Sequence, residues 1–279
     1  RDNVVVTRVP VHPYENFVPC FKSVLAASAY DVVFLSHVFF DSGYRIPSLE
    51  EIVDSVPDKN TVIVIDGYHA FCAIPTSLRA IQNRIFYIAG GYKYAQYGEG
   101  ACFMHIPRGC TLRPENTGWF AEFGPCEEVN QRAEVSYSDD GYRFWGATFD
   151  PAGLYRLNAV ASWMREHNLT IEEIHTHVVG LQEHFLKCVA RKGLQTFHQS
   201  NLLTPMDSAR RGHFLSYACK DPAEAVHLKQ QLHRMNVVVD TRGTLLRVGF
   251  GIYHDRDDVG ALVECMHIAE SANKERRTS

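Results

Sequence analysis

The sequence predicts an α/β fold, in which a large domain with a mostly parallel sheet precedes a smaller α+β domain. Two continuous apolar runs, VVFLSHVFF at 32–40 and TVIVID at 61–66, are typical of strands buried on both faces of a parallel sheet. The last third of the chain has a different order, with a strand, a helix, a hairpin and a helix. We therefore expect a large domain over residues 1–165 and a C-terminal domain over residues 166–279.

The elements of the large domain follow from local patterns. SLEEIVDSV at 48–56 begins with a serine followed by acids, as a capped crossover helix does. IFYIAGG at 85–91 and CFMHIP at 102–107 are predicted to be further strands. The stretch 152–168 has helical periodicity, and its apolar face would contain Leu154, Leu157, Val160, Ala161 and Met164.

The C-terminal domain is predicted from five segments in order. A helix from Ile171 to Arg191 would bury one apolar face, made of Ile174, Val178, Leu181, Phe185 and Leu186. The segments after it are a strand, a helix, a hairpin closed by Arg242 and Gly243, and a last helix, at 212–219, 222–235, 236–250 and 257–274.

Composition is typical of an intracellular enzyme of the cytoplasm. The chain has 279 residues, 46% of them hydrophobic, and can bury a sizeable core. A net charge of −4 without a basic stripe argues against nucleic-acid binding. No apolar stretch approaches the roughly 20 residues of a membrane helix.

Cysteines and histidines give no metal-binding pattern. Eight cysteines show no paired CxxC spacing, which argues against a zinc ribbon. Those in apolar runs, such as Cys102 in GACFMHI, are expected to be buried hydrophobic residues. His175 and His177 are two apart on a predicted helix and would point in different directions, so they are not expected to share a metal.

Three polar residues stand in an order that suggests pyridoxal phosphate (PLP). Asp66 ends a predicted strand, His69 follows three residues later, and Lys93 lies among glycines in GGYKYAQYGEG. A lysine forms a Schiff base with the cofactor aldehyde, and a carboxylate facing the pyridine nitrogen keeps the ring protonated. His69 would lie over the ring or bond its phenolic oxygen. Taken singly, these residues also fit a helix cap, a core histidine and a loop lysine.

At these residues the chain resembles the class V aminotransferase family of fold-type I PLP enzymes, most closely kynureninase. The resemblance implies that Ser36 contacts the cofactor and that Tyr92, just before Lys93, binds its phosphate. It implies a second phosphate contact from Trp119, in the pair Gly118-Trp119. Thr148, in FWGATFDP, would reach the cofactor of a neighbouring subunit, so the resemblance also implies a homodimer with a shared active site.

The C-terminal segment TRGTLLRVGFGIYHDRDDV resembles the family's segment in which an arginine, here Arg247, grips the substrate α-carboxylate. A planar fork of donors suits a carboxylate bidentately. Without the other matches, Arg247 would fit a surface strand residue in a salt bridge. The substrate is expected to be a small-molecule amino acid.

The reaction is left open among several chemistries. A kynureninase-like hydrolase fits best, although the family's usual asparagine near Thr148 is absent. The alternatives are an aminotransferase, a C–S or C–C lyase on another amino acid, or a catalytically silent dimeric relative. Cysteine desulfurase chemistry is disfavoured because no cysteine lies between Cys219 and Cys265. A dinucleotide-binding domain is disfavoured because glycines 90, 91, 98 and 100 do not form GxGxxG before a helix.

The start of the sequence lacks one expected feature. Nothing in RDNVVVTRVPVHPYENF at 1–17 supplies the glycine- and threonine-rich turn that holds the cofactor phosphate in this family. We therefore expect the chain to be a portion of a longer protein, with a separately supplied segment or a loss of tight cofactor binding as the alternatives.

Overall fold

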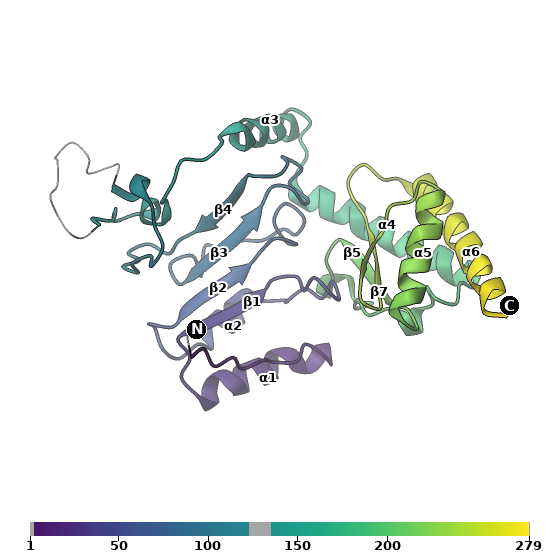
Figure 1. The fold of residues 1–279 in the computed structure, drawn as a ribbon, viewed down its shortest axis with the longest axis horizontal. Helices are drawn as coiled ribbons and strands as arrows, with labels where there is room; N and C mark the ends of the chain where they lie inside the picture. The colour runs from purple at the N-terminus through teal and green to yellow at the C-terminus, as the bar shows by residue number, and fades with distance from the viewer. Residues whose placement is uncertain (1–2, 123–134, 279) are drawn as a thin grey trace. The chain divides into compact units, whose positions relative to one another are not determined.

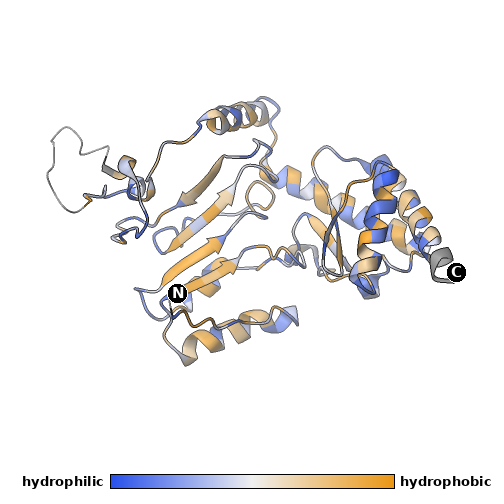
Figure 2. Cartoon of the chain, in the orientation of Figure 1, coloured by the Kyte–Doolittle hydropathy of each residue, from blue (hydrophilic) through white to orange (hydrophobic). Residues whose placement is uncertain are grey.

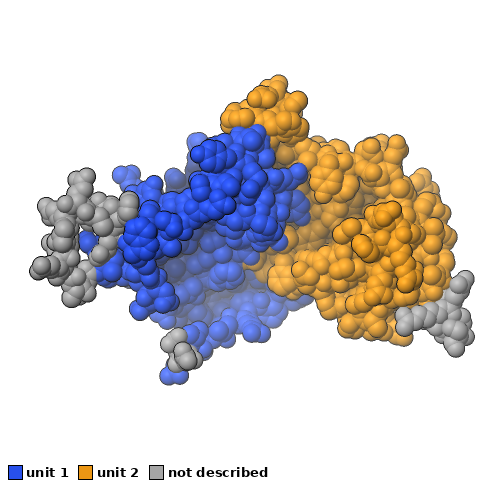
Figure 3. Space-filling view, turned by 45° about the horizontal axis from the view of Figure 1, so that its top comes forward, with its two compact units in different colours: residues 1–35, 48–68, 77–160 blue, residues 36–47, 69–76, 161–279 orange. Residues whose placement is uncertain are grey.

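The computed structural model describes residues 3–122 and 135–278, which form two compact units (Figure 3). Unit 1 contains residues 1–35, 48–68 and 77–160, and unit 2 contains residues 36–47, 69–76 and 161–279. The sequence places the domain boundary between residues 165 and 166, whereas the units divide at residue 160, inside a helix. Two short segments from the first third of the chain also belong to unit 2.

Unit 1 contains a four-stranded sheet of β1 (Val32–Ser36), β2 (Val62–Asp66), β3 (Ile85–Gly90) and β4 (Cys102–His105), in that order (Figure 1). All four strands are predicted from the sequence. β2 and β3 are parallel, but β3 and β4 are antiparallel. The connection between β3 and β4, residues 91–101, contains turns and no helix, whereas a parallel neighbour needs a crossover that is usually helical.

The strands of unit 1 are less deeply buried than predicted. In β1 buried Val33 and Leu35 alternate with Val32 and Phe34, which are 56% and 59% exposed. β2 alternates in the same way between buried and half-buried residues, and only β3 is buried along most of its length. The prediction that β1 is buried on both faces is therefore wrong. Its apolar run, orange in Figure 2, does not distinguish one covered face from two.

Two helices of unit 1 precede or connect the strands. α1 (Tyr14–Ala27) was not predicted, although Phe17, Phe21 and Leu25 recur at every fourth position and are buried. α2 (Leu49–Asp54) was predicted, and the Ser48 hydroxyl accepts a hydrogen bond from the backbone N–H of Glu51 at 3.1 Å, as a helix cap should.

The helix α3 (Ala152–Glu166) forms where it was predicted, but its apolar face is not buried. Only Gly153 is buried in it, and Leu154 is 46% exposed. In unit 1 the helix is tied by polar contacts instead: the Arg156 side chain donates hydrogen bonds to the carbonyl oxygens of Tyr97 at 2.8 Å and Glu99 at 3.0 Å. The spacing of apolar residues predicted the helix correctly, but it did not predict that polar contacts of Arg156 hold the helix in place.

Unit 2 begins with α4 (Ile171–Lys192), a long helix with clear signals at both ends. Thr170 and Glu173 form a reciprocal capping box at its start, and Gly193 ends it in the left-handed conformation with φ 70°. The other main elements follow in the predicted order: β5 (Phe214–Ala218), α5 (Pro222–Arg234), β6 (Asp240–Arg242), β7 (Leu245–Gly249) and α6 (Arg256–Thr278).

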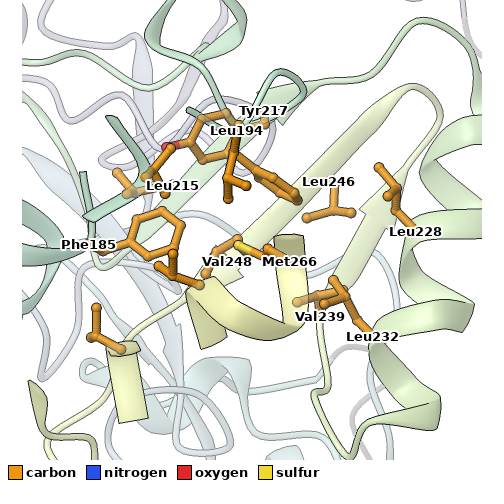
Figure 4. Close-up of a cluster of buried hydrophobic side chains, with 14 of the residues drawn as sticks. Phe185, Leu194, Leu215, Tyr217, Leu228, Leu232, Val239, Leu246, Val248 and Met266 are labelled. Carbon is orange, nitrogen blue, oxygen red and sulfur yellow. The ribbon is translucent and has the colours of Figure 1, made fainter. Parts of the chain in front are cut away.

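The three strands of unit 2 form an antiparallel sheet in the order β5-β7-β6. Gly243 makes the predicted hairpin turn with φ 57°. Helices α4, α5 and α6 contribute apolar faces to the core beside this sheet, where Phe185, Leu215, Tyr217, Leu246 and Met266 are fully or almost fully buried (Figure 4).

Short 3-10 helices occupy the connections: Trp119–Glu122, Gly141–Phe144, Gln199–Asn201 and Ser208–Arg210. Cys188 and Cys219 are buried, as expected of cysteines in apolar runs, but Cys102 is exposed. The expectation for Cys102 is wrong because it lies on β4, whose residues are exposed or half-buried. Within residues 3–122 and 135–278, no helix has both the length and the apolar character needed to cross a bilayer.

Candidate active site

The eight residues predicted to form the site are divided between the two units. Unit 1 carries the larger group, and unit 2 carries Ser36, His69 and Arg247. The group in unit 1 consists of Asp66, Tyr92, Lys93, Trp119 and Thr148.

Asp66 is the last residue of β2, and the backbone fixes its position. Its Oδ1 accepts a hydrogen bond from the backbone N–H of Tyr68 at 2.9 Å, which turns the chain directly after the strand. The N–H of Gly67 donates to the carbonyl oxygen of Ile88 on β3 at 2.8 Å. The carboxylate of Asp66 therefore lies at the C-terminal end of β2.

Lys93 lies in a tight turn that starts where β3 ends. The N–H of Gly91 donates to the carbonyl oxygen of Ala101 at 2.9 Å, and the N–H of Tyr97 donates to that of Gly91 at 3.0 Å, which closes the turn. A Cβ on Gly91 would lie 1.9 Å from a ring carbon of Tyr97, and Tyr97 is buried. Only glycine fits at position 91, so the glycine pair before Lys93 has a structural role.

The structure brings Asp66 and Lys93 to one edge of the unit 1 sheet. β2 and β3 are parallel neighbours, and Asp66 pairs with Ile88 in their register. Adjacent parallel strands end on the same edge, which is where ligands bind in open α/β sheets. We call this the carboxyl edge, meaning the C-terminal ends of β2 and β3 with the Lys93 turn.

Tyr68, Tyr92 and Cys102 gather at the carboxyl edge. The rings of Tyr68 and Tyr92 are 5.7 Å apart, and the Lys93 ammonium lies 5.7 Å from the centre of the Tyr92 ring. A Cβ on Gly90 would lie 2.6 Å from the Tyr68 ring and 2.9 Å from the Cys102 sulfur. The hydrogen bond with Cys102 and burial raise the pKa of Tyr68 well above its ordinary value, and burial also raises the pKa of Tyr92. Both phenols therefore stay protonated at neutral pH.

Trp119 and Thr148 lie elsewhere in unit 1. The Trp119 ring is 66% exposed and packs edge-on against Phe120, whose N–H donates to the carbonyl oxygen of Gly146 at 3.3 Å. The segments that carry Trp119 and Thr148 are thus neighbours.

A ring contact places this aromatic region along the sheet. Phe144 contacts Phe86, the second residue of β3, with ring centres 6.0 Å apart. Lys93 follows the other end of that strand. The part of this aromatic region around Phe144 therefore lies toward the start of β3.

In unit 2, His69 and Arg247 share Phe214 as a neighbour. The ring centres of His69 and Phe214 are 5.3 Å apart, and the Arg247 guanidinium carbon lies 5.3 Å from the centre of the Phe214 ring. Ser36, the last residue of β1, is half-buried. The structure therefore groups His69 with Arg247 around one aromatic ring.

Arg247 already has a carboxylate partner. Its Nη2 donates to Oδ2 of Asp240, and its Nη1 donates to the carbonyl oxygen of Phe40 at 2.6 Å. The Arg247 side chain is only 12% exposed. Burial alone would raise the pKa of Asp240, but the hydrogen bond and charge of Arg247 outweigh it and lower that pKa.

Sequence reasoning missed Tyr68, Cys102, Phe214 and Asp240. A signal for Asp240 is present in the hairpin. Arg242 pairs with Leu245 around the turn, so two positions farther out Asp240 must pair with Arg247. No comparable signal marks Phe214, because its role depends on segments far apart in the chain.

Comparison with solved structures identifies the fold. A cysteine desulfurase from Thermococcus onnurineus NA1 matches with a TM-score of 0.74 and 14% identity, over 91% of this chain and 63% of its own. The cysteine desulfurase CsdA from Escherichia coli (TM-score 0.71, 16% identity, 90% and 62%) and an alanine–glyoxylate aminotransferase from Nostoc sp. (TM-score 0.64, 14% identity, 90% and 64%) also match. The chain has the α/β fold of fold-type I PLP-dependent enzymes.

One part of the sequence gives a narrower match. Residues 174–266 match the family model of the kynureninase C-terminal domain. That segment contains Asp240 and Arg247 and most of unit 2. No curated protein matches the sequence. The chain spans about 63% of the length of the first cysteine desulfurase that it matches.

Proposed function

We propose that this chain is a PLP-dependent enzyme of the class V aminotransferase family that acts on an amino acid in the manner of kynureninase. One observation carries the proposal: Asp66 and the Lys93 turn lie at the C-terminal ends of adjacent parallel strands. A carboxylate and a primary amine at one ligand-binding edge are the donor set that PLP needs.

The residues at the carboxyl edge fit the cofactor. PLP, when bound, supplies an aldehyde that condenses with an amine and a ring that accepts carbanion electrons. Lys93 Nζ would hold the cofactor covalently and then move a proton as a general base. Asp66 would keep a proton on the pyridine nitrogen. Tyr92, whose phenol stays protonated, can donate a hydrogen bond to a phosphate oxygen.

Unit 2 would supply the substrate contacts. Arg247 is proposed to bind the substrate α-carboxylate, and His69, beside the same Phe214 ring, to face the cofactor. The match of residues 174–266 to the kynureninase C-terminal domain supports this assignment, because the matched segment includes Arg247. Ser36 is proposed as a further cofactor contact.

A homodimer with a shared active site is part of the proposal. Phe144, in the aromatic region that also carries Trp119 and Thr148, contacts Phe86 near the start of β3, whereas Lys93 follows the end of that strand. A strand of six residues spans roughly 20 Å. This separation favours a role for Trp119 and Thr148 in the active site of a second copy of the chain over a role in their own.

The reaction could also be that of an aminotransferase or a lyase. The solved structures that match include an alanine–glyoxylate aminotransferase and a cystine C–S lyase, which makes these the second candidates. A cysteine desulfurase is less favoured, because the sequence has no cysteine between Cys219 and Cys265. A catalytically silent relative would retain the fold without binding PLP.

The proposal is tested by cofactor attachment. Purified protein is mixed with PLP, its visible absorbance is recorded, and borohydride reduction followed by peptide mapping locates the attached cofactor. We expect attachment at Lys93 and its loss in Lys93→Ala. Amino-acid substrates, kynurenine first, would then be screened for product formation to choose among the reactions.

A second lysine variant controls for effects of removing any surface lysine. Lys59 is an exposed lysine in the loop before β2, and Lys59→Ala should leave both the absorbance and the mapped peptide unchanged. If wild-type protein shows no visible band, or if reduced PLP is found on a lysine other than Lys93, the proposed function is wrong and the silent relative is favoured.

A further inference from the structure

The hydrogen bonds of Arg247 leave a defined part of its guanidinium for a ligand. A guanidinium has five N–H groups: one on Nε and two on each Nη. Nε is buried and, among the described residues, has no hydrogen-bond partner. Nη1 bonds the carbonyl oxygen of Phe40, and Nη2 bonds Asp240. With respect to the part of the chain that the structure describes, one N–H therefore remains on each Nη, and a bidentate carboxylate accepts two such hydrogen bonds.

Three contacts hold the guanidinium in this orientation. Phe40 anchors one Nη with its backbone, Asp240 anchors the other, and the Phe214 ring lies 5.3 Å from the guanidinium carbon. Of these three contacts, that of Phe40 comes from the backbone and that of Phe214 from an aromatic ring. A substitution at position 240 removes the third contact and leaves the other two in place. The Asp240 contact is therefore the one on which the position of the second Nη depends.

Arg242 offsets the charge that Asp240 brings. Its Nη1 donates to Oδ1 of Asp240 at 2.8 Å, while Oδ2 faces Arg247. Two arginines and one carboxylate leave a net charge of about +1, so Arg247 keeps its attraction for an incoming anion. The Asp240 carboxylate is also fixed by its neighbour, because Oδ1 accepts a hydrogen bond from the backbone N–H of Thr241 at 2.8 Å.

We propose that Asp240 is a positioning residue, which orients the Arg247 guanidinium so that its two remaining Nη hydrogens face the α-carboxylate of the amino-acid substrate. Asp240 does not touch the substrate; it acts through Arg247. This inference rests on the proposed function and deepens it, because it assigns the carboxylate selectivity of that site to the ion pair between Asp240 on β6 and Arg247 on β7.

The test compares two probes on PLP-loaded protein. L-alanine carries the α-carboxylate, and ethylamine is the same molecule without it, so the ratio of their affinities isolates the carboxylate contact. Binding is followed by the change in visible absorbance. We expect Asp240→Ala to lower the ratio at least tenfold, and Asp240→Asn, which keeps an oxygen for Arg247, to stay within about threefold of wild type.

Control variants separate the possible outcomes. Glu264→Ala removes the acid of an exposed ion pair with Lys192 in the same unit and should leave the ratio unchanged. Arg247→Gln should lower the ratio more than any Asp240 variant. An unchanged ratio in Asp240→Ala together with a lowered ratio in Arg247→Gln overturns the role of Asp240 alone. An unchanged ratio in Arg247→Gln, or no PLP binding by wild type, overturns the proposed function and this inference with it.

An equal loss in Asp240→Asn and Asp240→Ala also overturns positioning, because it makes the negative charge, rather than the oriented oxygen, the property that matters. Should Asp240→Ala fail to fold, Asp240→Ser supplies the same comparison, since its shorter side chain cannot reach Arg247 as the aspartate does. A lowered ratio in Asp240→Ser with a normal ratio in Asp240→Asn supports the proposal.

Discussion

Unit 1 and unit 2 hold their candidate site residues by different means. In unit 1 the backbone does so: Asp66 ends a strand, and Lys93 lies in a turn that only glycine at position 91 allows. In unit 2 side chains do so, because Arg247 is held by Asp240 and lies over the ring of Phe214. The first kind of placement depends on local geometry, and the second depends on partners from distant segments.

This difference predicts how each unit responds to substitution. A residue placed by backbone geometry is sensitive to changes at the glycines and strand ends beside it. A residue placed by side-chain partners is sensitive to loss of a partner, because a buried charge left without its counterion is costly.

Gly91→Ala is expected to have the largest effect. The new Cβ would lie 1.9 Å from the ring of Tyr97, which is buried and cannot swing away. Overpacking of this kind should lower the free energy of unfolding by on the order of 3 kcal/mol. Because the turn must shift, PLP attachment at Lys93 should also fall. Denaturant unfolding and visible absorbance measure the two effects.

Gly180 provides the matched control for that substitution. It lies in α4, and a Cβ on it would meet nothing within 4 Å. Gly180→Ala should stabilise the protein by roughly 0.5 to 1 kcal/mol, since alanine favours a helix over glycine. Equal destabilisation by both alanines would contradict the view that backbone crowding at position 91 fixes the Lys93 turn.

The same contrast explains how far the sequence could be read. The strands and the order Asp66, His69, Lys93 were predictable, because strand ends and glycine turns leave local signals in the sequence. The antiparallel direction of β4, the exposure of Phe34 and the unburied face of α3 were not, because they depend on what lies on each side of an element. The Asp240 partner of Arg247 needed the hairpin register as well as the motif.

Acid should destabilise unit 2 before unit 1. His37, His175 and His213 have a displaced pKa, and each of them belongs to unit 2. Burial and the neighbouring His175 lower the pKa of His213 to about 3, and its Nε2 lies 3.0 Å from Nδ1 of His175. Burial, with Arg45 and Arg211 nearby, also lowers the pKa of His175.

The sign of the effect follows from proton linkage. At pH well above about 6.5, His213 is neutral in both the folded and the unfolded chain and contributes no pH dependence. Below that pH the unfolded chain gains a proton that the folded chain does not, so the free energy of unfolding falls until the pH reaches about 3. Between pH 6.5 and 4.5 we expect His213 alone to account for a loss of about 2 kcal/mol, to which His37, with a pKa also lowered to about 3, adds.

Hydrogen exchange at pH 7 and pH 4.5, read peptide by peptide and corrected for the intrinsic rate, would locate this loss. Peptides of α4 and β5 should lose protection before peptides of β2 and β3. His213→Gln should reduce the acid dependence but leave the part that His37 and His175 contribute, whereas His233→Gln, on the exposed surface of α5, should leave all of it as in wild type. Simultaneous loss of protection in both units would argue against the buried histidines as the cause.

Thr170→Ala is expected to have the smallest effect. Thr170 accepts a hydrogen bond from the N–H of Glu173 at 3.1 Å, and its own N–H donates to Glu173 Oε2 at 2.8 Å. Losing this cap should lower the free energy of unfolding by about 1 kcal/mol. Thr176→Ala, in the same helix, removes an exposed hydroxyl that donates to the carbonyl oxygen of Glu172 one turn back, and it should change the free energy of unfolding by less than about 0.5 kcal/mol. Because the cap belongs to unit 2, PLP attachment at Lys93 should be unaffected; a loss of attachment in Thr170→Ala would show that the turn in unit 1 depends on more than its own backbone.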